Sequence, residues 1–340
     1  MNVGVIGYGY WGPNLVRNFA ELRDSQVLMV SDLRQDRLTK VVARYPSIQM
    51  TTNYQDIILN PAVDAVIIAT PVSTHYPLAL EALRAGKHVW IEKPIATTSE
   101  QALHLMEEAA QRGLVLMVDH TFVYTGAVRK IAQLISNGDL GQVYYYDATR
   151  VNLGLFQRDV NVLWDLAVHD LSIIEHVFQS KPRAVSATGI SHIPDQPENL
   201  AYMTLFFEDS LIAHVNVNWL SPVKVRRTLI GGSKKMIVYD ELEPSEKLKI
   251  YDKGITLDRV GEEGMYQMLI DYRTGDMWSP QIENTEALQS AALHFKDCIE
   301  NQTTPITGGE SGLRIVQILQ AATQSIAQHG ALVELNTGHT

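Results

Sequence analysis

The sequence has one cysteine, no long hydrophobic run and fewer basic than acidic residues. Cys298 alone can form neither an intramolecular disulfide nor a cysteine-rich metal site. No window approaches the roughly 18 apolar residues of a membrane span, and the residues after Met1 lack the basic region of a signal peptide. We therefore expect a cytoplasmic protein with no membrane partner.

The charge balance also disfavours a nucleic-acid partner. The chain carries 28 Lys and Arg against 38 Asp and Glu, a formal net charge of −10. Binding to a phosphate backbone needs cations that displace condensed counterions, and this composition has few to spare. Hydrophobic residues make up 46% of the sequence, which is typical of a folded globular protein.

At 340 residues the chain is long enough for about two domains. From residue 1 to 120, short apolar runs alternate with amphipathic stretches of helical period, a pattern that predicts a doubly wound parallel sheet. The expected strands cover residues 2–7, 26–31, 64–70, 88–92 and 114–119, and the expected helices cover residues 13–22, 74–86 and 99–113.

The pattern changes after residue 120. We expect a helix over 126–138, a long strand over 142–153 and a helix over 162–178. Several strands follow without helices between them, which indicates a mostly antiparallel sheet. Two helices, near 285–300 and 310–328, end the pattern. The fold class is thus α/β: a Rossmann domain over 1–120 and an α+β domain with a large, open sheet over 121–340.

Three glycines between the first strand and the first helix form the pattern G-x-G-x-x-G. Gly7 permits a tight turn, Gly9 allows the backbone to approach a pyrophosphate, and Gly12 allows close packing of the helix. The helix N-terminus adds N–H donors and a positive dipole for the phosphates. This turn predicts a dinucleotide site.

Asp32, which ends the second strand 20 residues after Gly12, specifies the nucleotide further. A carboxylate at this place accepts hydrogen bonds from ribose hydroxyls and repels a 2′-phosphate, so the expected cofactor is NAD. Arg34 and Arg37 leave NADP open as the alternative, since either could cover a phosphate.

The sequence "WIEKPIATT" places Glu92, Lys93 and Pro94 at the carboxyl end of a predicted parallel strand, where open α/β sheets bind ligands. The proline restricts the backbone at Lys93 to extended conformations. A lysine here can stabilise a developing alkoxide.

Asp165 and His169 are four residues apart on a predicted helix, so they share a face. Removal of hydride from a secondary alcohol needs a base for the hydroxyl proton, and histidine titrates in the required range. The neighbours Asp170 and His176 add metal-ligand residue types, but no zinc-site spacing accompanies them, and we expect no metal.

Together the glycine motif, "ATPVSTHYPLALEALRAGKHVWIEKP" and the pair Asp165-x-x-x-His169 resemble the glucose-fructose oxidoreductase and inositol dehydrogenase family, Gfo/Idh/MocA. The resemblance covers nearly the whole chain. It implies that Lys93 lies by the nicotinamide and the substrate hydroxyl, that His169 is the general acid or base, and that Asp165 orients or polarises. It also implies a homodimer or homotetramer joined through the C-terminal sheet.

The resemblance further implies which residues border the cofactor. They lie in the glycine turn, at the ends of the predicted strands 26–31, 64–70 and 88–92, and just after those ends: Gly7, Gly9, Tyr10, Trp11, Gly12, Asp32, Thr70, Pro71, Thr74, His75, Glu92 and Lys93.

The residues expected to bind the substrate depart from the family pattern. Many family members carry an arginine after the fifth strand, where this chain has "VDHTFVYTG" with His120 and Tyr124. The stretches 152–157 and 161–170 resemble nucleotide-sugar 3-dehydrogenases, and planar guanidinium groups suit an anionic substrate. Expected substrate contacts, besides Asp165 and His169, are His120, Tyr124, Arg150, Asn152, Arg158, Asn161 and Trp164, although such arginines can instead pair with carboxylates.

These observations predict an NAD-dependent dehydrogenase that oxidises a secondary hydroxyl, at C3, of a sugar or of a nucleotide sugar such as UDP-N-acetylglucosamine or its uronic acid. The alternatives are an inositol or aldose dehydrogenase, an NAD-dependent glycosidase that oxidises C3 transiently, and a noncatalytic NAD sensor.

Overall fold

The chain divides into two compact units in the computed structural model, which describes residues 1–154, 160–258 and 269–335. The first unit comprises residues 1–125 and 284–320, and the second comprises 126–283 and 321–340. Residues 284–320, which follow the second domain's strands in the sequence, thus pack within the first unit.

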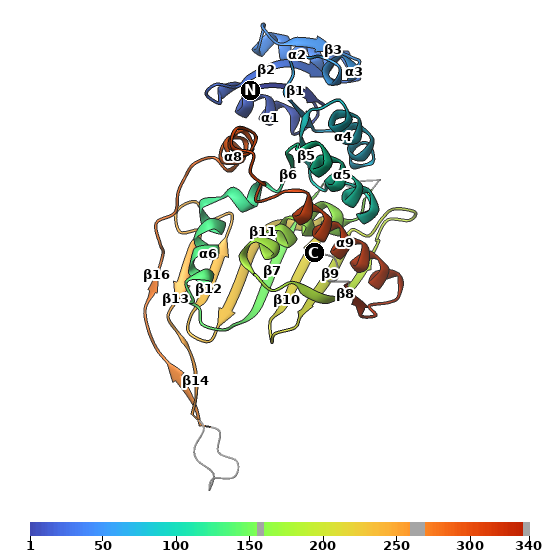
Figure 1. Ribbon diagram of the computed structural model, residues 1–340. Coiled ribbons are helices and arrows are strands. Elements are labelled where there is room, and N and C mark those ends of the chain that lie inside the picture. The colour runs from blue at the N-terminus through green and yellow to red at the C-terminus, as the bar shows by residue number, and fades with distance from the viewer. Residues whose placement is uncertain (155–159, 259–268, 336–340) are drawn as a thin grey trace. The chain divides into compact units, whose positions relative to one another are not determined.

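A sheet of parallel strands in the order β3-β2-β1-β4-β5-β6 forms the centre of the first unit (Figure 1). The strand order reverses where β1 meets β4, and ligands of doubly wound sheets bind beside such a point. The predicted Rossmann fold is confirmed. The elements are β1 (Asn2–Ile6), α1 (Gly12–Glu21), β2 (Gln26–Ser31), α2 (Gln35–Arg44), β3 (Gln49–Thr51), α3 (Gln55–Ile58), β4 (Ala65–Ile68), α4 (His75–Arg84), β5 (His88–Glu92), α5 (Ser99–Arg112), β6 (Leu116–Asp119), α8 (Ala287–Asn301) and the first part of α9 (Gly309–Ala327).

Aromatic packing explains why α8 belongs to the first unit. Phe19 of α1, Trp90 of β5 and Phe295 of α8 are all fully buried. Their rings meet edge to face, with centroids 5.4 to 6.3 Å apart. Such contacts add to the stabilisation from apolar burial and fasten α8 to the parallel sheet.

The second unit is built on a sheet that, within the described residues, has the order β16-β13-β12-β11-β7-β10-β9-β8-β17 (Figure 1). All neighbours are antiparallel except β7 and β10, so the predicted mostly antiparallel sheet is confirmed. The elements are α6 (Gly126–Ser136), β7 (Val143–Leu153), α7 (Val168–Val177), β8 (Pro182–Ile190), β9 (Leu200–Phe207), β10 (Ile212–Asn218), β11 (Leu220–Gly232), β12 (Met236–Asp240), β13 (Leu248–Tyr251), β16 (Met277–Trp278) and β17 (Val333–Glu334), with a separate pair β14 (Gly254–Asp258) and β15 (Leu269–Arg273).

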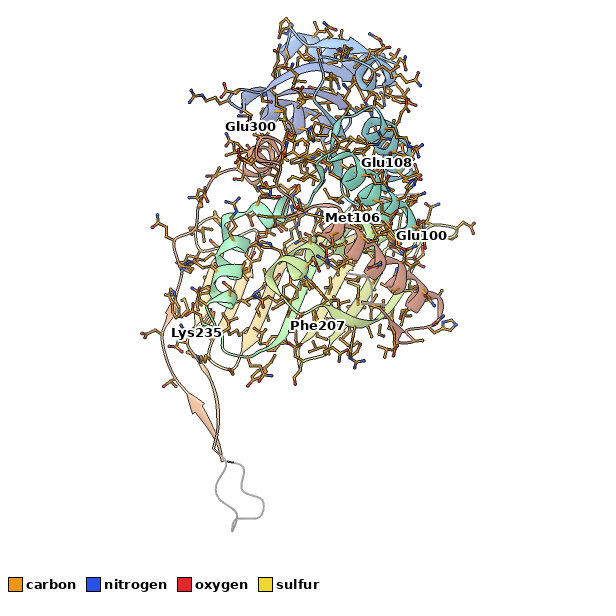
Figure 2. All side chains as sticks on the ribbon, in the orientation of Figure 1. Glu100, Met106, Glu108, Phe207, Lys235 and Glu300 are labelled. Carbon is orange, nitrogen blue, oxygen red and sulfur yellow. The ribbon has the colours of Figure 1, made fainter. Side chains whose placement is uncertain are left out.

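Phe178, which follows α7, anchors that helix to one face of this sheet. Its ring packs edge to face on Tyr146 of β7, 6.0 Å away, and on Phe207 of β9, 6.3 Å away. Phe207, which is labelled in Figure 2, is buried. This packing fixes the helix that follows the Asp165 turn. Over the part of the chain that is described, no helix has both the length and the apolar character needed to cross a membrane.

Two local differences from the sequence analysis stand out. Residues 35–58 hold α2, β3 and α3, which were not predicted; β3 has three residues and α3 has four, too few to show a clear period. The predicted helix 162–178 is a π-helical turn, Leu163–Ala167, that continues into α7. Such wider turns occur often at functional sites.

Candidate active site

The glycine turn after β1 has the geometry of a dinucleotide site. Gly7 has a φ of +99°, and a Cβ there would lie 2.4 Å from the carbonyl oxygen of Ala69. A Cβ on Gly12 would lie 2.5 Å from the carbonyl oxygen of Gly7. A Cβ on Gly9, by contrast, would make only an ordinary contact of 3.6 Å with Nη1 of Arg37. These residues fit a pyrophosphate at the N-terminus of α1.

Asp32 ties the end of β2 to this turn. Its Oδ2 accepts hydrogen bonds from the N–H of Tyr8 at 2.7 Å and from Nη1 of Arg37 at 3.2 Å. Arg34 pairs instead with Asp36, through two bonds of 3.1 and 2.8 Å. Both arginines that left NADP open therefore contact carboxylates.

The remaining residues expected at the cofactor divide into exposed and buried groups. Tyr10 is 83% exposed and Trp11 is 42% exposed in the glycine turn. Pro71 and Thr74 are exposed after β4, and Thr74 Oγ1 lies 2.7 Å from Thr70 Oγ1. His75 is buried, with each ring nitrogen 2.8 Å from a backbone carbonyl oxygen, so it supports the loops around it.

A buried cluster of titratable groups lies at the carboxyl ends of β5 and β6. Glu92 and Asp119 occupy paired positions of these parallel strands, and both are buried. Burial, together with the charge and the hydrogen bond of Asp119, raises the pKa of Glu92 well above its ordinary value. Burial also raises the pKa of Asp119, which accepts from Thr121 Oγ1 at 2.7 Å. Half-buried Lys93 follows Glu92 directly.

His120 completes this cluster. It is 1% exposed, and neither ring nitrogen has a hydrogen-bond partner among the described residues. Burial, aided by the charge of Lys93, lowers the pKa of His120 to about 3. The imidazole is therefore neutral at physiological pH.

The low pKa of His120 predicts a pH-dependent loss of stability. Above pH 6.5 the His120 ring is neutral in both the folded and the unfolded chain. Between pH 6.5 and about 3, the ring is protonated in the unfolded chain but stays neutral in the folded chain. The wild-type chain should therefore lose stability as the pH falls, and His120→Phe should not lose it in this way. The free energy of unfolding of His120→Phe, minus that of the wild type, should increase by about 1–2 kcal/mol between pH 7.5 and pH 5. Urea unfolding at the two pH values measures this difference, with His329→Phe, at an exposed site, as control. A constant difference would contradict it.

In the second unit, the π-helical turn carries Asp165 and the first turn of α7 carries His169, four residues later, and both are half-buried. Oδ1 of Asn161 caps the turn by accepting from the N–H of Leu163 at 3.1 Å, while its side-chain amide donates to Glu198. Oδ2 of Asp165 accepts from Nε1 of Trp219 at 3.0 Å. The indole thus holds the carboxylate in one orientation beside the histidine.

Trp219 and Asp119 are polar partners that the sequence analysis missed. Trp219 is 1% exposed, and a Cβ on Gly154 would lie 2.4 Å from its ring. Asp119 ends a strand that was predicted, next to the strand that ends in Glu92. The signal for Asp119 was its place at a strand end, whereas nothing near Trp219 in the sequence links it to Asp165.

Arg150 and Tyr124, expected at the substrate, serve packing instead. Arg150 is 3% exposed, and its guanidinium donates to Asp170 at 2.8 and 3.2 Å and to Glu241 at 2.9 Å. Burial opposes its charge, but Asp170 and Glu241 raise the pKa of Arg150 above its usual range. Tyr124 is 2% exposed, with its hydroxyl 3.2 Å from Thr307 Oγ1. The ring of Tyr124 and the charge of Arg150 thus make their contacts inside their own units.

The other residues that were expected to contact the substrate differ in their burial and hydrogen bonding. Trp164 is half-buried and donates through Nε1 to Thr323 Oγ1 at 3.0 Å. Asn152 is half-buried, and its buried Oδ1 has no hydrogen-bond partner within the described residues. Arg158 lies outside the described residues. Over the described ranges, no group of three or more His, Cys, Asp or Glu side chains is placed to hold a metal ion.

Comparison with known sequences gives two family matches. Residues 1–120 match an oxidoreductase family with an NAD-binding Rossmann fold, and residues 128–238 match a Gfo/Idh/MocA C-terminal domain. A UDP-N-acetylglucosamine 3-dehydrogenase from Acidithiobacillus ferrooxidans is 30% identical over 303 residues, which cover 86% of this chain and 90% of that protein.

Two further comparisons extend this result. An NADP-dependent scyllo-inositol 2-dehydrogenase from Bacillus subtilis is 24% identical, over 96% of this chain and 93% of the relative. The solved structure of a UDP-N-acetylglucosamine 3-dehydrogenase from Acidithiobacillus ferrooxidans superposes with a TM-score of 0.78 and 25% identity, over 96% of this chain and 98% of that one. The likeness thus covers both units.

Proposed function

Because the chain belongs to the Gfo/Idh/MocA family of oxidoreductases, with its NAD-binding Rossmann fold, we propose that it is an NAD-dependent dehydrogenase acting on a secondary hydroxyl of a sugar or nucleotide sugar. The observation that carries the proposal is the pair Asp165 and His169, half-buried on one turn, in a chain that also has Lys93 at a strand end of its Rossmann sheet.

The first unit binds the cofactor in this proposal. The glycine turn and the N-terminus of α1 bind the pyrophosphate, and Asp32 binds the adenosine ribose. NAD, when bound, supplies the acceptor for the hydride that leaves the substrate carbon.

The chain's own side chains handle the proton and the charge. His169 accepts the hydroxyl proton as the C–H hydride departs, and the alcohol becomes a ketone. Lys93 stabilises the negative charge that develops on the oxygen. Asp165, held by Trp219, orients the imidazole of His169.

The finer proposal is oxidation at C3 of a UDP-linked sugar such as UDP-N-acetylglucosamine or its uronic acid. The relative at 30% identity supports it. Since Arg150 is buried in ion pairs and Arg226 pairs with Glu241, the anion contact is proposed for Arg158. Arg158→Ala should weaken UDP-sugar affinity and leave NAD affinity unchanged, which parallel titrations would measure.

Purified protein with NAD and a panel of UDP-sugars, inositols and aldoses tests the reaction through the absorbance of NADH. We expect a UDP-sugar to give net NADH and a stable keto-sugar. Release of a glycosidic substituent without net NADH would select the glycosidase alternative. Cofactor binding with no turnover on any of these compounds would favour a sensor.

Asp32 predicts the choice of NAD over NADP. Asp32→Ser removes the charge that repels a 2′-phosphate and releases Arg37, which Asp32 contacts at 3.2 Å. We expect NADH affinity to fall and NADPH affinity to rise, each by about tenfold or about 1.4 kcal/mol. Fluorescence titration of both reduced cofactors measures this, with Asp139→Ser, which loses a contact with Lys235 in the second unit, as the control. A native preference for NADP would contradict the assignment.

The open sheet of the second unit supports a homo-oligomer. Tyr145, Tyr202 and Ile212 lie on the same face of adjacent strands and are 36 to 42% exposed. Exposed apolar patches of this kind often mark protein interfaces. We propose a homodimer or homotetramer through this face, which light scattering would test.

A further inference from the structure

His75 connects two loops at the carboxyl edge of the parallel sheet. It begins α4 and is 1% exposed. Its Nε2 lies 2.8 Å from the carbonyl oxygen of Thr70, and its Nδ1 lies 2.8 Å from the carbonyl oxygen of Pro94. Thr70 follows β4 and Pro94 follows β5, which are neighbours in the sheet.

Each of the two loops belongs to a different part of the site. The Thr70 loop packs on the glycine turn, because a Cβ on Gly7 would lie 2.4 Å from the Ala69 oxygen and 3.0 Å from Thr70 Cγ2. Thr74 reinforces the loop by donating to the Pro71 carbonyl at 2.7 Å. Pro94, on the other side, follows Lys93 directly. One rigid ring therefore spans the distance from the cofactor turn to the lysine.

We propose that His75 is a positioning residue that holds Lys93 in register with the cofactor-binding turn; this rests on the proposed function. The ring does not act on the substrate, since both nitrogens face backbone carbonyl oxygens inside the first unit. Placement errors of about 1 Å in a catalytic group can lower rates by about a hundredfold, so a fixed link between these loops has a large effect.

Two substitutions test the two contacts of the ring separately. In His75→Gln the amide nitrogen takes the place of Nε2 and keeps the contact with the Thr70 carbonyl. In His75→Asn it takes the place of Nδ1 and keeps the contact with the Pro94 carbonyl. We expect His75→Gln to retain NADH affinity and lose turnover by about tenfold, and His75→Asn to retain most turnover at saturating cofactor and lose NADH affinity by about tenfold. His75→Ala should lose both.

The measurements are NADH fluorescence titration, kcat and KM, and hydrogen exchange of the full chain. Exchange should rise at residues 92–96 in His75→Gln and at residues 69–74 in His75→Asn. His88→Gln and His88→Asn are matched controls, because His88 lies at the other end of β5 and its Nδ1 accepts from the Val115 N–H at 3.0 Å.

The predicted split between the two variants supports the proposal. Equal, absent or reversed effects of the Gln and Asn variants overturn it, as does a loss of thermal stability alone, which a packing role would produce. Hydrogen exchange and NADH affinity can both be measured without a sugar substrate. If no sugar is oxidised while the split in exchange persists, the dehydrogenase proposal fails and the link between the loops remains.

Discussion

Replacing Lys93 with methionine should lower turnover by about 10²–10³-fold, because the neutral side chain no longer stabilises the charge that develops on the substrate oxygen. Methionine keeps the length and flexibility of the lysine stem, so its packing at the end of β5 changes little. NADH affinity should stay within a few-fold of the native value. Steady-state kinetics with the best substrate of the panel and NADH titration measure the two effects.

Lys87→Met is the control for Lys93→Met. Lys87 lies before the other end of β5, where its Nζ donates to the carbonyl oxygens of Asn60 and Val63 at 2.8 and 2.7 Å. Its loss should lower stability without changing turnover per folded molecule. His169→Asn should match Lys93→Met in size, since general acid–base groups contribute about 10²–10⁴-fold. Native turnover in both variants would remove the proposed chemistry.

Replacing Arg150 with methionine should lower the free energy of unfolding by about 3–5 kcal/mol. The substitution leaves Asp170, whose side chain is 2% exposed, without the two hydrogen bonds from the guanidinium. A buried carboxylate without its cation is costly. Chemical denaturation of the native and variant chains measures the loss.

Two further variants identify the origin of the Arg150 effect. Arg150→Met with Asp170→Asn should recover part of the stability, because the neutral amide leaves no uncompensated charge there. Arg226→Met should cost less, about 1 kcal/mol, since Arg226 pairs with the same Glu241 but its side chain is partly exposed. A stable Arg150→Met chain with weakened UDP-sugar affinity would return Arg150 to the substrate site.

The local parts of the site were predictable because they depend on neighbouring residues. The glycine turn needs a strand, three glycines and a helix within about a dozen residues, and its backbone agrees with that expectation. Lys93 follows a strand that an apolar run predicts. Asp165 and His169 are one turn apart whether that turn is α-helical or π-helical.

Other parts of the site depend on contacts that no local pattern records. Arg150 pairs with Glu241, 91 residues away, and Trp219 donates to Asp165, 54 residues away. A sequence shows that an arginine or an indole is present, but its partner is set by how strands and helices pack. The arginine expected at a ligand was therefore found in a buried ion pair.

By itself, the sequence determined the Rossmann class of the first sheet and five of its six strands, the mostly antiparallel second sheet, and the residues available for cofactor and proton chemistry. Apolar periodicity and turn residues act over a few neighbours, and these features need nothing more. Tertiary structure alone decided that 284–320 pack with the first unit, where Phe295 meets Phe19 and Trp90. It also paired Glu92 with Asp119 and joined Thr70 to Pro94 through His75, because burial and hydrogen bonding act between residues that only folding brings together.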